Sequence, residues 1–249
     1  MRAGFCLFFL SAVLMRAAGE CGRLRELKLA NASVISARQI AAGAFRPADL
    51  KADAPEAANY KKLPRFCKVE IDASPTSDSR IAIEVWLPLT NWNGKFRGQG
   101  NGGFAGALDY RGLAGSLDLG YATAATDAGH QGEAEDASWA LHHPEKIVDF
   151  GYRAIHETAQ IARKVIQSFY GEPPGRAYFD ACSDGGREAL MEAQRFPEDY
   201  DGILAGAPAN YWTHLLAGGL DVLKTVTASP ANFIPPDRLP RITAAVFKA

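Results

Sequence analysis

The chain has 249 residues, with 27 lysines and arginines against 28 aspartates and glutamates, and 47% of its residues are hydrophobic. A net charge near zero argues against a polybasic protein that binds nucleic acid or a membrane surface. The apolar fraction excludes a disordered chain, and the length allows one large domain or two small ones with a sizeable core.

Residues 1–19 are predicted to be a secretory signal peptide. Arg2 gives a positive start, an apolar run fills residues 3–15, and small residues at Ala17 and Gly19 permit cleavage after position 19. A membrane anchor is the alternative, but the run is shorter than the roughly 20 residues of a spanning helix. We therefore expect an exported protein, secreted or periplasmic, without membrane attachment after cleavage.

Export changes what the cysteines are expected to do, because disulfides persist in an oxidising compartment. Cys6 leaves with the signal, so that Cys21, Cys67 and Cys182 remain. We expect Cys21 and Cys67 to form a disulfide, which would stabilise the fold by roughly 4 kcal/mol in the chain-entropy description. Cys182 is then left without a partner in this chain.

Strand and helix patterns alternate from residue 81 onward. Short apolar or alternating runs predict strands over residues 81–88, 95–99, 120–126, 176–182 and 202–207. Amphipathic patterns that end at glycine or proline predict helices over residues 151–170 and 185–196. Strands separated by helices indicate an α/β fold with a mainly parallel sheet.

The clearest chemical signal is Ser183, which lies between the predicted strand 176–182 and the helix 185–196. Residues 181–185 are Ala-Cys-Ser-Asp-Gly, close to the Gly-x-Ser-x-Gly of a nucleophile elbow with alanine in place of the first glycine. Small neighbours are needed there because the backbone passes close to itself in a sharp turn. The alternative is that Ser183 only caps the following helix. The pattern favours Ser183 as a nucleophile.

A serine nucleophile needs hydrogen-bond donors for the negative charge that develops on the substrate. The start of a helix favours such charge, and the backbone N–H of Asp184 is the first candidate donor. A glycine-rich loop at residues 100–106 offers the second, from Gly102 or Gly103. An ordinary glycine turn explains this loop equally well, whereas the spacing does not fit a phosphate-binding loop.

The chain does not offer a convincing base for Ser183. In α/β-hydrolases the acid and the histidine follow the serine, and only His214 does so here. His214 comes a few residues after the strand 202–207, and we do not assign it as the base. Four histidines precede the serine and are interpreted as structural or surface residues, namely His130, His142, His143 and His156.

The sequence resembles the tannase and feruloyl esterase family over most of the chain that follows the signal. The matching stretches are residues 63–71, 83–106, 120–130, 139–157 and 179–209, the last of which is the most specific. The resemblance implies an α/β-hydrolase fold whose lid is inserted after the sixth strand. It places a partial catalytic domain at residues 20–210 and the start of the lid at 211–249. The implied function is that of a serine esterase for galloyl or feruloyl esters.

The resemblance also implies groups that this chain does not contain. In the family, the cysteine before the serine pairs with a cysteine before the catalytic histidine, and Cys182 matches the first of these. Its partner, the histidine, the acidic residue and the calcium site of the lid are expected beyond Ala249. The chain alone is therefore expected to be inactive or incomplete. The alternative is an exported, non-catalytic binding fragment. The expected partner is a small aromatic ester, not a nucleic acid, and the oligomeric state is left open.

Overall fold

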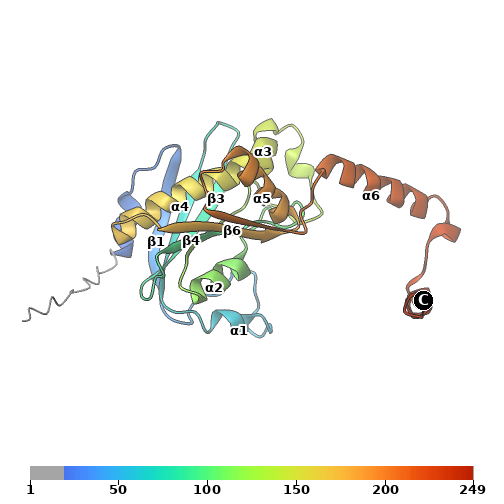
Figure 1. Cartoon of the computed structure of the whole chain (residues 1–249), viewed down its shortest axis with the longest axis horizontal. Helices are drawn as coiled ribbons and strands as arrows, with labels where there is room; N and C mark the ends of the chain where they lie inside the picture. Colours follow the sequence, from blue (N-terminus) through green and yellow to red (C-terminus); the bar gives the residue numbers. More distant parts are fainter. Residues whose placement is uncertain (1–19, 249) are drawn as a thin grey trace, which may run out of the picture. The chain divides into compact units, whose positions relative to one another are not determined.

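The computed structural model describes residues 20–248, so the predicted signal peptide and Cys6 lie outside the described residues. The chain divides into two compact units between Pro208 and Ala209. The first unit is built on one seven-stranded sheet with the order β1-β2-β3-β5-β4-β6-β7 (Figure 1). The strands are β1 (Ala32–Ile40), β2 (Phe66–Ala73), β3 (Ile81–Pro88), β4 (Lys95–Gly98), β5 (Ala122–Thr126), β6 (Arg176–Cys182) and β7 (Gly202–Gly206).

The expected α/β fold is confirmed, with one addition at its N-terminal side. Strands β5, β4, β6 and β7 are parallel, whereas β1, β2 and β3 add an antiparallel extension beside β5. The sequence pattern did not reveal β1 and β2, so the strand expected at 202–207 is the seventh of this chain. In β2 the apolar run is interrupted by Lys68, which is buried and paired with Glu70 and Glu84 at 2.9 and 2.8 Å.

Helices cover both faces of the sheet, with α4 and α5 on one face and α1 and α2 on the other (Figure 1). The helical segments of the first unit are η1 (Cys21–Glu26), α1 (Ala57–Tyr60), α2 (Tyr110–Asp118), η2 (Ser138–Ala140), α3 (Pro144–Val148), η3 (Asp149–Arg153), α4 (Ala154–Tyr170) and α5 (Asp184–Arg195). The predicted helix 151–170 thus starts inside a π-helical turn. It ends at Gly171, whose φ of 80° is the left-handed conformation that closes many helices.

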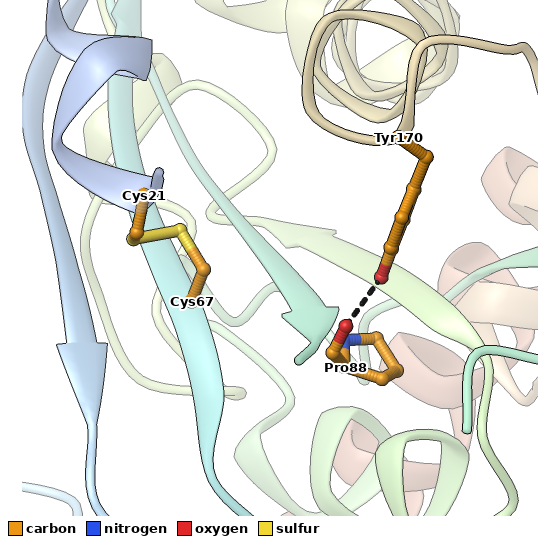
Figure 2. The surroundings of a disulfide bond; sticks show 4 residues. All are labelled: Cys21, Cys67, Pro88 and Tyr170. Atoms are coloured by element: carbon orange, nitrogen blue, oxygen red, sulfur yellow. Dashed lines mark hydrogen bonds between the residues drawn. A yellow bond between two sulfur atoms is a disulfide. The ribbon is translucent and has the colours of Figure 1, made fainter. Parts of the chain in front are cut away.

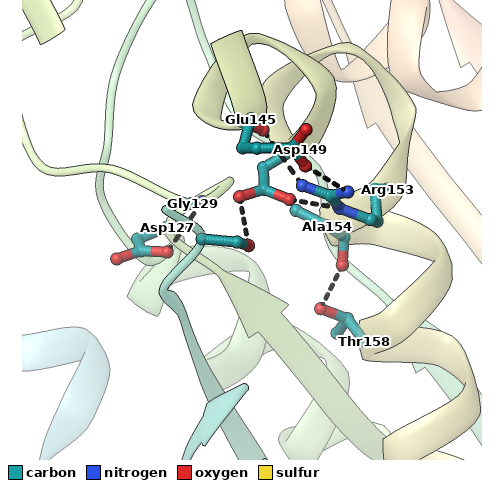
Figure 3. A network of polar contacts seen from close by, with 8 residues as sticks. Asp127, Gly129, Glu145, Asp149, Arg153, Ala154 and Thr158 are labelled. Atoms are coloured by element: carbon teal, nitrogen blue, oxygen red, sulfur yellow. Dashed lines mark hydrogen bonds and ion pairs between the residues drawn. The ribbon is translucent and has the colours of Figure 1, made fainter. Parts of the chain in front are cut away.

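A polar network fixes the π-helical turn against the loop that follows β5 (Figure 3). The buried Asp149 accepts hydrogen bonds from Arg153 and Ser79, at 2.6 and 2.5 Å. Gly129 packs against this carboxylate so closely that a Cβ there would lie 2.5 Å from the Asp149 Cβ. The Asp127 carboxylate accepts a hydrogen bond from the Gly129 N–H at 3.0 Å, and burial raises the pKa of Asp127 to about 7.

The expected disulfide between Cys21 and Cys67 is confirmed (Figure 2). The two Cα atoms are 5.6 Å apart, and both side chains are buried. The bond ties the short helix η1 to β2, which lies inside the sheet. Nearby, the hydroxyl of Tyr170 at the end of α4 donates to the carbonyl of Pro88 at 2.8 Å. The first residues of the described chain are thus held to the same sheet that carries the candidate site.

The second unit consists of short helical segments. These are α6 (Trp212–Thr227), η4 (Pro230–Asn232), η5 (Pro236–Arg238) and α7 (Leu239–Val246). Neither α6 nor α7 has a buried residue. Across the described residues 20–248, we find no helix that combines the length and the apolar character needed to cross a bilayer.

Candidate active site

Ser183 occupies a sharp turn between β6 and α5. Its φ and ψ are 62° and −120°, a conformation that residues with a side chain rarely adopt and that stores about 1–3 kcal/mol of strain. The turn is held by two backbone hydrogen bonds, from the Ser183 N–H to Gly206 and from the Arg187 N–H to the Ser183 carbonyl, at 3.0 and 3.2 Å. The serine is exposed, and its hydroxyl does not cap α5. The geometry therefore favours a nucleophile over a helix cap.

Glycines after the serine let the helix begin directly against the sheet. A Cβ on Gly185 would lie 2.6 Å from the Ala181 Cβ, and one on Gly186 would lie 2.5 Å from the Gly206 carbonyl oxygen. Real Cβ atoms do not approach other atoms this closely. Ala181 occupies the position of the first glycine of the motif, and its methyl group already fills the space available there. This crowding explains why small residues surround Ser183.

The glycine-rich loop lies beside this turn, as its sequence position after a central strand predicts. The Gly185 N–H donates to the Asn101 carbonyl at 2.8 Å. Gly102 is exposed, and no atom lies within 4 Å of where its Cβ would be. Gly103 has a φ of 61° and packs against Ala134 instead. Of the two candidate donors, Gly102 is the one that faces open space.

A surface cavity of about 410 Å³ lies between this loop and the end of β6. Its lining includes Asn101, Gly102, Leu108, Asp180, Ala181 and Cys182. The cavity thus adjoins the candidate donor Gly102 and Cys182, the residue that directly precedes Ser183. Cys182 is exposed and carries a free thiol.

The backbone N–H and the side-chain carboxylate of Asp184 have different surroundings. Asp184 is the first residue of α5, so its N–H has no partner within the helix and remains a candidate donor. Its carboxylate is buried and accepts two hydrogen bonds from Arg187, at 2.6 and 3.1 Å. Burial raises the pKa of Asp184, and the Arg187 guanidinium opposes that rise. The side chain therefore anchors the helix start.

Three histidines that precede the serine have other partners, in agreement with their interpretation as structural residues. The contacts are His130 Nε2 to the Phe104 carbonyl at 2.7 Å, His143 Nδ1 to Asp78 at 2.8 Å, and His156 Nδ1 to Asp199 at 2.6 Å. His142 is exposed. Among the described residues no histidine forms a hydrogen bond with Ser183, and His214 belongs to α6 of the second unit. A base for Ser183 is therefore not assigned.

The pair of His156 and Asp199 makes stability depend on pH. The hydrogen bond that His156 donates to the Asp199 carboxylate raises the pKa of His156 above 6.5, while burial opposes the rise. The folded state therefore holds this proton more tightly, so the stabilisation is complete below about pH 6.5 and is lost as pH rises through the folded pKa. We expect His156→Gln to lower the free energy of unfolding by about 1 kcal/mol more at pH 5.5 than at pH 9.

Urea denaturation of both proteins at the two pH values measures this difference. His143→Gln is the control, because His143 also pairs with an aspartate but its side chain is 44% exposed. Exposed pairs contribute little to stability. An equal loss at both pH values for His156→Gln would contradict the assignment.

Gly100 and Gly102 offer a matched pair of alanine substitutions. A Cβ on Gly100 would lie 2.6 to 2.8 Å from atoms of Ala181, Glu188 and Gly185, whereas a Cβ on Gly102 meets nothing within 4 Å. We expect Gly100→Ala to lower the free energy of unfolding by about 2–3 kcal/mol, and Gly102→Ala by much less, because overpacking strains a closed site. Thermal and urea unfolding check both. Equal effects of the two substitutions would refute the packing described here.

No group of three or more His, Cys, Asp or Glu side chains able to hold a metal ion occurs among the described residues 20–248. The described residues therefore offer no donor set that fits calcium. The calcium site expected for the lid stays a prediction from the family resemblance.

The sequence reasoning did not identify Asn101 or Glu188 as part of this site. The Asn101 N–H donates to Glu188 Oε2 at 2.9 Å, and both residues are buried. A usable signal was present in the sequence. Acidic residues at 184, 188 and 192 recur every four positions, which places them on one face of a helix. Figure 1 shows that α5 packs on the sheet, and all three side chains are buried.

Comparisons with known proteins agree with this geometry. The sequence profile described as "Tannase and feruloyl esterase" matches residues 67–249. An uncharacterized esterase of Xanthomonas campestris pv. campestris is 40% identical over 231 residues, which are 93% of this chain and 39% of that protein. A probable feruloyl esterase B of Aspergillus niger is 33% identical over 69% of this chain and 33% of its own length.

A solved structure of a feruloyl esterase is also similar to this chain. The crystal structure of feruloyl esterase B from Aspergillus oryzae matches with a TM-score of 0.75 and 30% identity, over 84% of this chain and 41% of that one. The chain thus spans 33% to 41% of the length of these relatives.

Proposed function

Because this chain belongs to the tannase and feruloyl esterase family, we propose that it carries the nucleophile of a serine carboxylic ester hydrolase that acts on aromatic acid esters, galloyl or feruloyl. One observation carries the proposal, namely the exposed Ser183 in a strained turn between β6 and α5. The names of the relatives support an esterase over the non-catalytic alternative.

The proposed reaction starts at the Ser183 hydroxyl. Its oxygen attacks the ester carbonyl carbon, the serine proton passes to a general base, and the carbonyl oxygen becomes an oxyanion. The backbone N–H groups of Gly102 and Asp184 are proposed to stabilise that oxyanion. Collapse of the intermediate breaks the ester C–O bond, releases the alcohol and leaves an acyl-enzyme. Water then hydrolyses the acyl-enzyme and releases the aromatic acid.

The general base is the part of this mechanism that is not assigned among the described residues. We propose, from the family resemblance, that a histidine outside the described residues provides it. Without a base the serine hydroxyl remains protonated, and loss of a triad member lowers the rate by several powers of ten. The oxyanion donors still retain a residual acceleration, so slow acylation by an activated ester is expected from this chain.

Export is proposed on two grounds. Residues 1–19 have the pattern of a signal peptide, and Cys21 and Cys67 form a disulfide, which is typical of oxidising compartments. The proposed ligand is a small aromatic ester.

The function is tested with the chain that starts at Glu20, with its disulfide intact. p-Nitrophenyl ferulate is added, and intact-mass and peptide analysis follow the acyl group. We expect one feruloyl group on the peptide that contains Ser183, and turnover of methyl ferulate and methyl gallate well below about 1 per second. p-Nitrophenyl hexanoate is the control for the acyl class. An adduct elsewhere would refute the nucleophile, and faster acylation by the hexanoyl ester would refute the aromatic preference.

Turnover of methyl ferulate at about 1 per second or more would show that this chain contains its own base. His214→Ala then decides whether His214 supplies it. Loss of activity in that variant would overturn the proposal that the base lies outside the described residues.

A further inference from the structure

Glu188 is a buried carboxyl directly behind the candidate active site. It lies one helical turn after Asp184 in α5 and is 1% exposed. Burying a carboxyl without compensation is unfavourable by several kcal/mol, so such groups usually have a specific partner. Glu188 Oε2 accepts the backbone N–H of Asn101 at 2.9 Å, across 87 positions in the sequence. Its partner therefore belongs to the glycine-rich loop and not to its own helix.

Helix α5 forms hydrogen bonds with both backbone polar groups of Asn101. The Asn101 N–H donates to Glu188, and the Asn101 carbonyl accepts from the Gly185 N–H at 2.8 Å. The Asn101 side-chain amide donates to the carbonyls of Ala107 and Thr126, both at 2.9 Å. The loop is thus fixed relative to the turn that carries Ser183, and Glu188 is the only side chain of α5 that takes part among the described residues.

The fixed orientation of Asn101 decides where the next N–H points. In a trans peptide the C=O and the following N–H point in opposite directions. Since the Asn101 carbonyl points at the Gly185 N–H, the Gly102 N–H points to the opposite side of this peptide, away from the Gly185 N–H. Among the described residues no acceptor takes this N–H, and Gly102 lines the cavity beside Ala181 and Cys182.

We propose that Glu188 is a positioning residue for the oxyanion site, because its carboxyl holds the Asn101 peptide so that the Gly102 N–H stays free to donate a hydrogen bond to the substrate carbonyl oxygen beside Ser183. The inference rests on the proposed ester hydrolase function. Glu188 does not touch the substrate, and it acts through Asn101. The close packing of Gly100 supports this role, because a Cβ there would lie 2.7 Å from Glu188 Oε2.

The surroundings of Glu188 favour its neutral form near pH 7. Burial raises its pKa to about 8, the charge of Asp184 adds to that rise, and Arg187 and the Asn101 N–H oppose it. Glu192 and Tyr200 also lie close enough to interact with this group. A glutamine retains the carbonyl acceptor and is uncharged, so it is the conservative replacement. A leucine has a similar size and removes the acceptor.

The test compares Glu188→Leu and Glu188→Gln with Glu192→Leu in the whole chain. Glu192 is buried on the same helix one turn further on, and it forms no hydrogen bond with the loop among the described residues. The nearby charge of Asp199 adds to the rise of its pKa that burial causes. Two quantities are measured at pH 7. They are the hydrogen exchange rate of the Asn101 amide, and the rate at which a fluorophosphonate labels Ser183.

We expect Glu188→Leu to accelerate the exchange by at least about tenfold and to slow the labelling by at least about tenfold, because an oxyanion donor is displaced. Glu188→Gln and Glu192→Leu are expected to stay within about threefold of the unchanged chain in both measurements. Unchanged rates in Glu188→Leu, or equal losses in Glu192→Leu, would overturn the inference.

The exchange measurement separates this inference from the proposed function. If the unchanged chain is not labelled at all, the slow acylation expected under the proposed function fails, while the exchange rates still decide whether Glu188 holds the loop. If Glu188→Leu does not fold, the pH dependence of the Asn101 amide proton shift decides instead. We expect a titration with a midpoint near pH 8 in the unchanged chain and none in Glu188→Gln. A titration that persists in Glu188→Gln would overturn the assignment.

Discussion

Ser183→Ala is expected to lower the rate of fluorophosphonate labelling by at least about 10³-fold, because the substitution removes the atom that forms the covalent bond. The fold should remain intact. Ser183 is exposed, and its hydroxyl does not cap α5. The strained backbone of this residue is compatible with alanine as poorly as with serine, so the two proteins should unfold at similar urea concentrations. Intact-mass spectrometry over several hours gives the labelling rates.

The neighbouring thiol calls for its own control. Cys182 is exposed and free, and it is a stronger intrinsic nucleophile than a serine hydroxyl. Cys182→Ala should retain the label on Ser183, and Ser183→Ala should show no label on Cys182. A label that disappears in Cys182→Ala and persists in Ser183→Ala would assign the reaction to the thiol and refute the serine mechanism.

Removal of the disulfide is expected to have the largest effect on stability. Cys21 and Cys67 are 46 positions apart, so their bond closes a long loop of the unfolded chain. In the chain-entropy description, closing a loop of this length stabilises the fold by roughly 4 kcal/mol. Both cysteines are buried. We therefore expect Cys21→Ala/Cys67→Ala to lose about that much free energy of unfolding in urea denaturation.

A second measurement separates the bond from the loss of packing. For this, the unsubstituted chain is denatured with urea in the presence of a reductant. Under these conditions it retains both cysteine side chains and lacks only the disulfide bond. It should lose nearly as much stability as the double variant. Free thiols at positions 21 and 67 in non-reduced peptide maps would contradict the disulfide itself. A loss below about 1 kcal/mol would show that the loop constraint is unimportant here.

Several buried acidic side chains have raised pKa values, and they all change the stability of the fold with pH in the same direction. Burial is the main cause for Asp127, Glu188 and Glu192, whose pKa values rise to about 7, 8 and 9. Each group keeps its proton in the folded state at pH values where the unfolded chain has released it. The folded state binds more protons, so stability falls as pH rises from about 5 to 9. This decline is common to the unsubstituted chain and to His156→Gln. The difference between their free energies of unfolding therefore isolates the contribution of His156.

Local sequence patterns were sufficient for the elements that build the core of the fold. Helix α4 buries residues at a spacing of three and four, and the central strands are short and apolar, so period and length identified them. The strands β1 and β2 were missed for a physical reason. Lys68 and Glu70 interrupt the apolar run of β2, and they are acceptable there only because Lys68 pairs both with Glu70 and with Glu84 on the adjacent strand β3. That compensation comes from tertiary structure.

The sequence by itself determined the identity of the candidate nucleophile and the disulfide. Small residues around Ser183 are a local steric requirement, and pairing of Cys21 with Cys67 followed from the cysteine count in a chain expected to be exported. Only the tertiary structure distinguished the surroundings of Gly102 from those of Gly103, since both are glycines of one loop. It placed Gly102 in open space and Gly103 against Ala134. It also brought Glu188 to Asn101, because two residues that are 87 positions apart become neighbours only when β4 and β6 pair side by side.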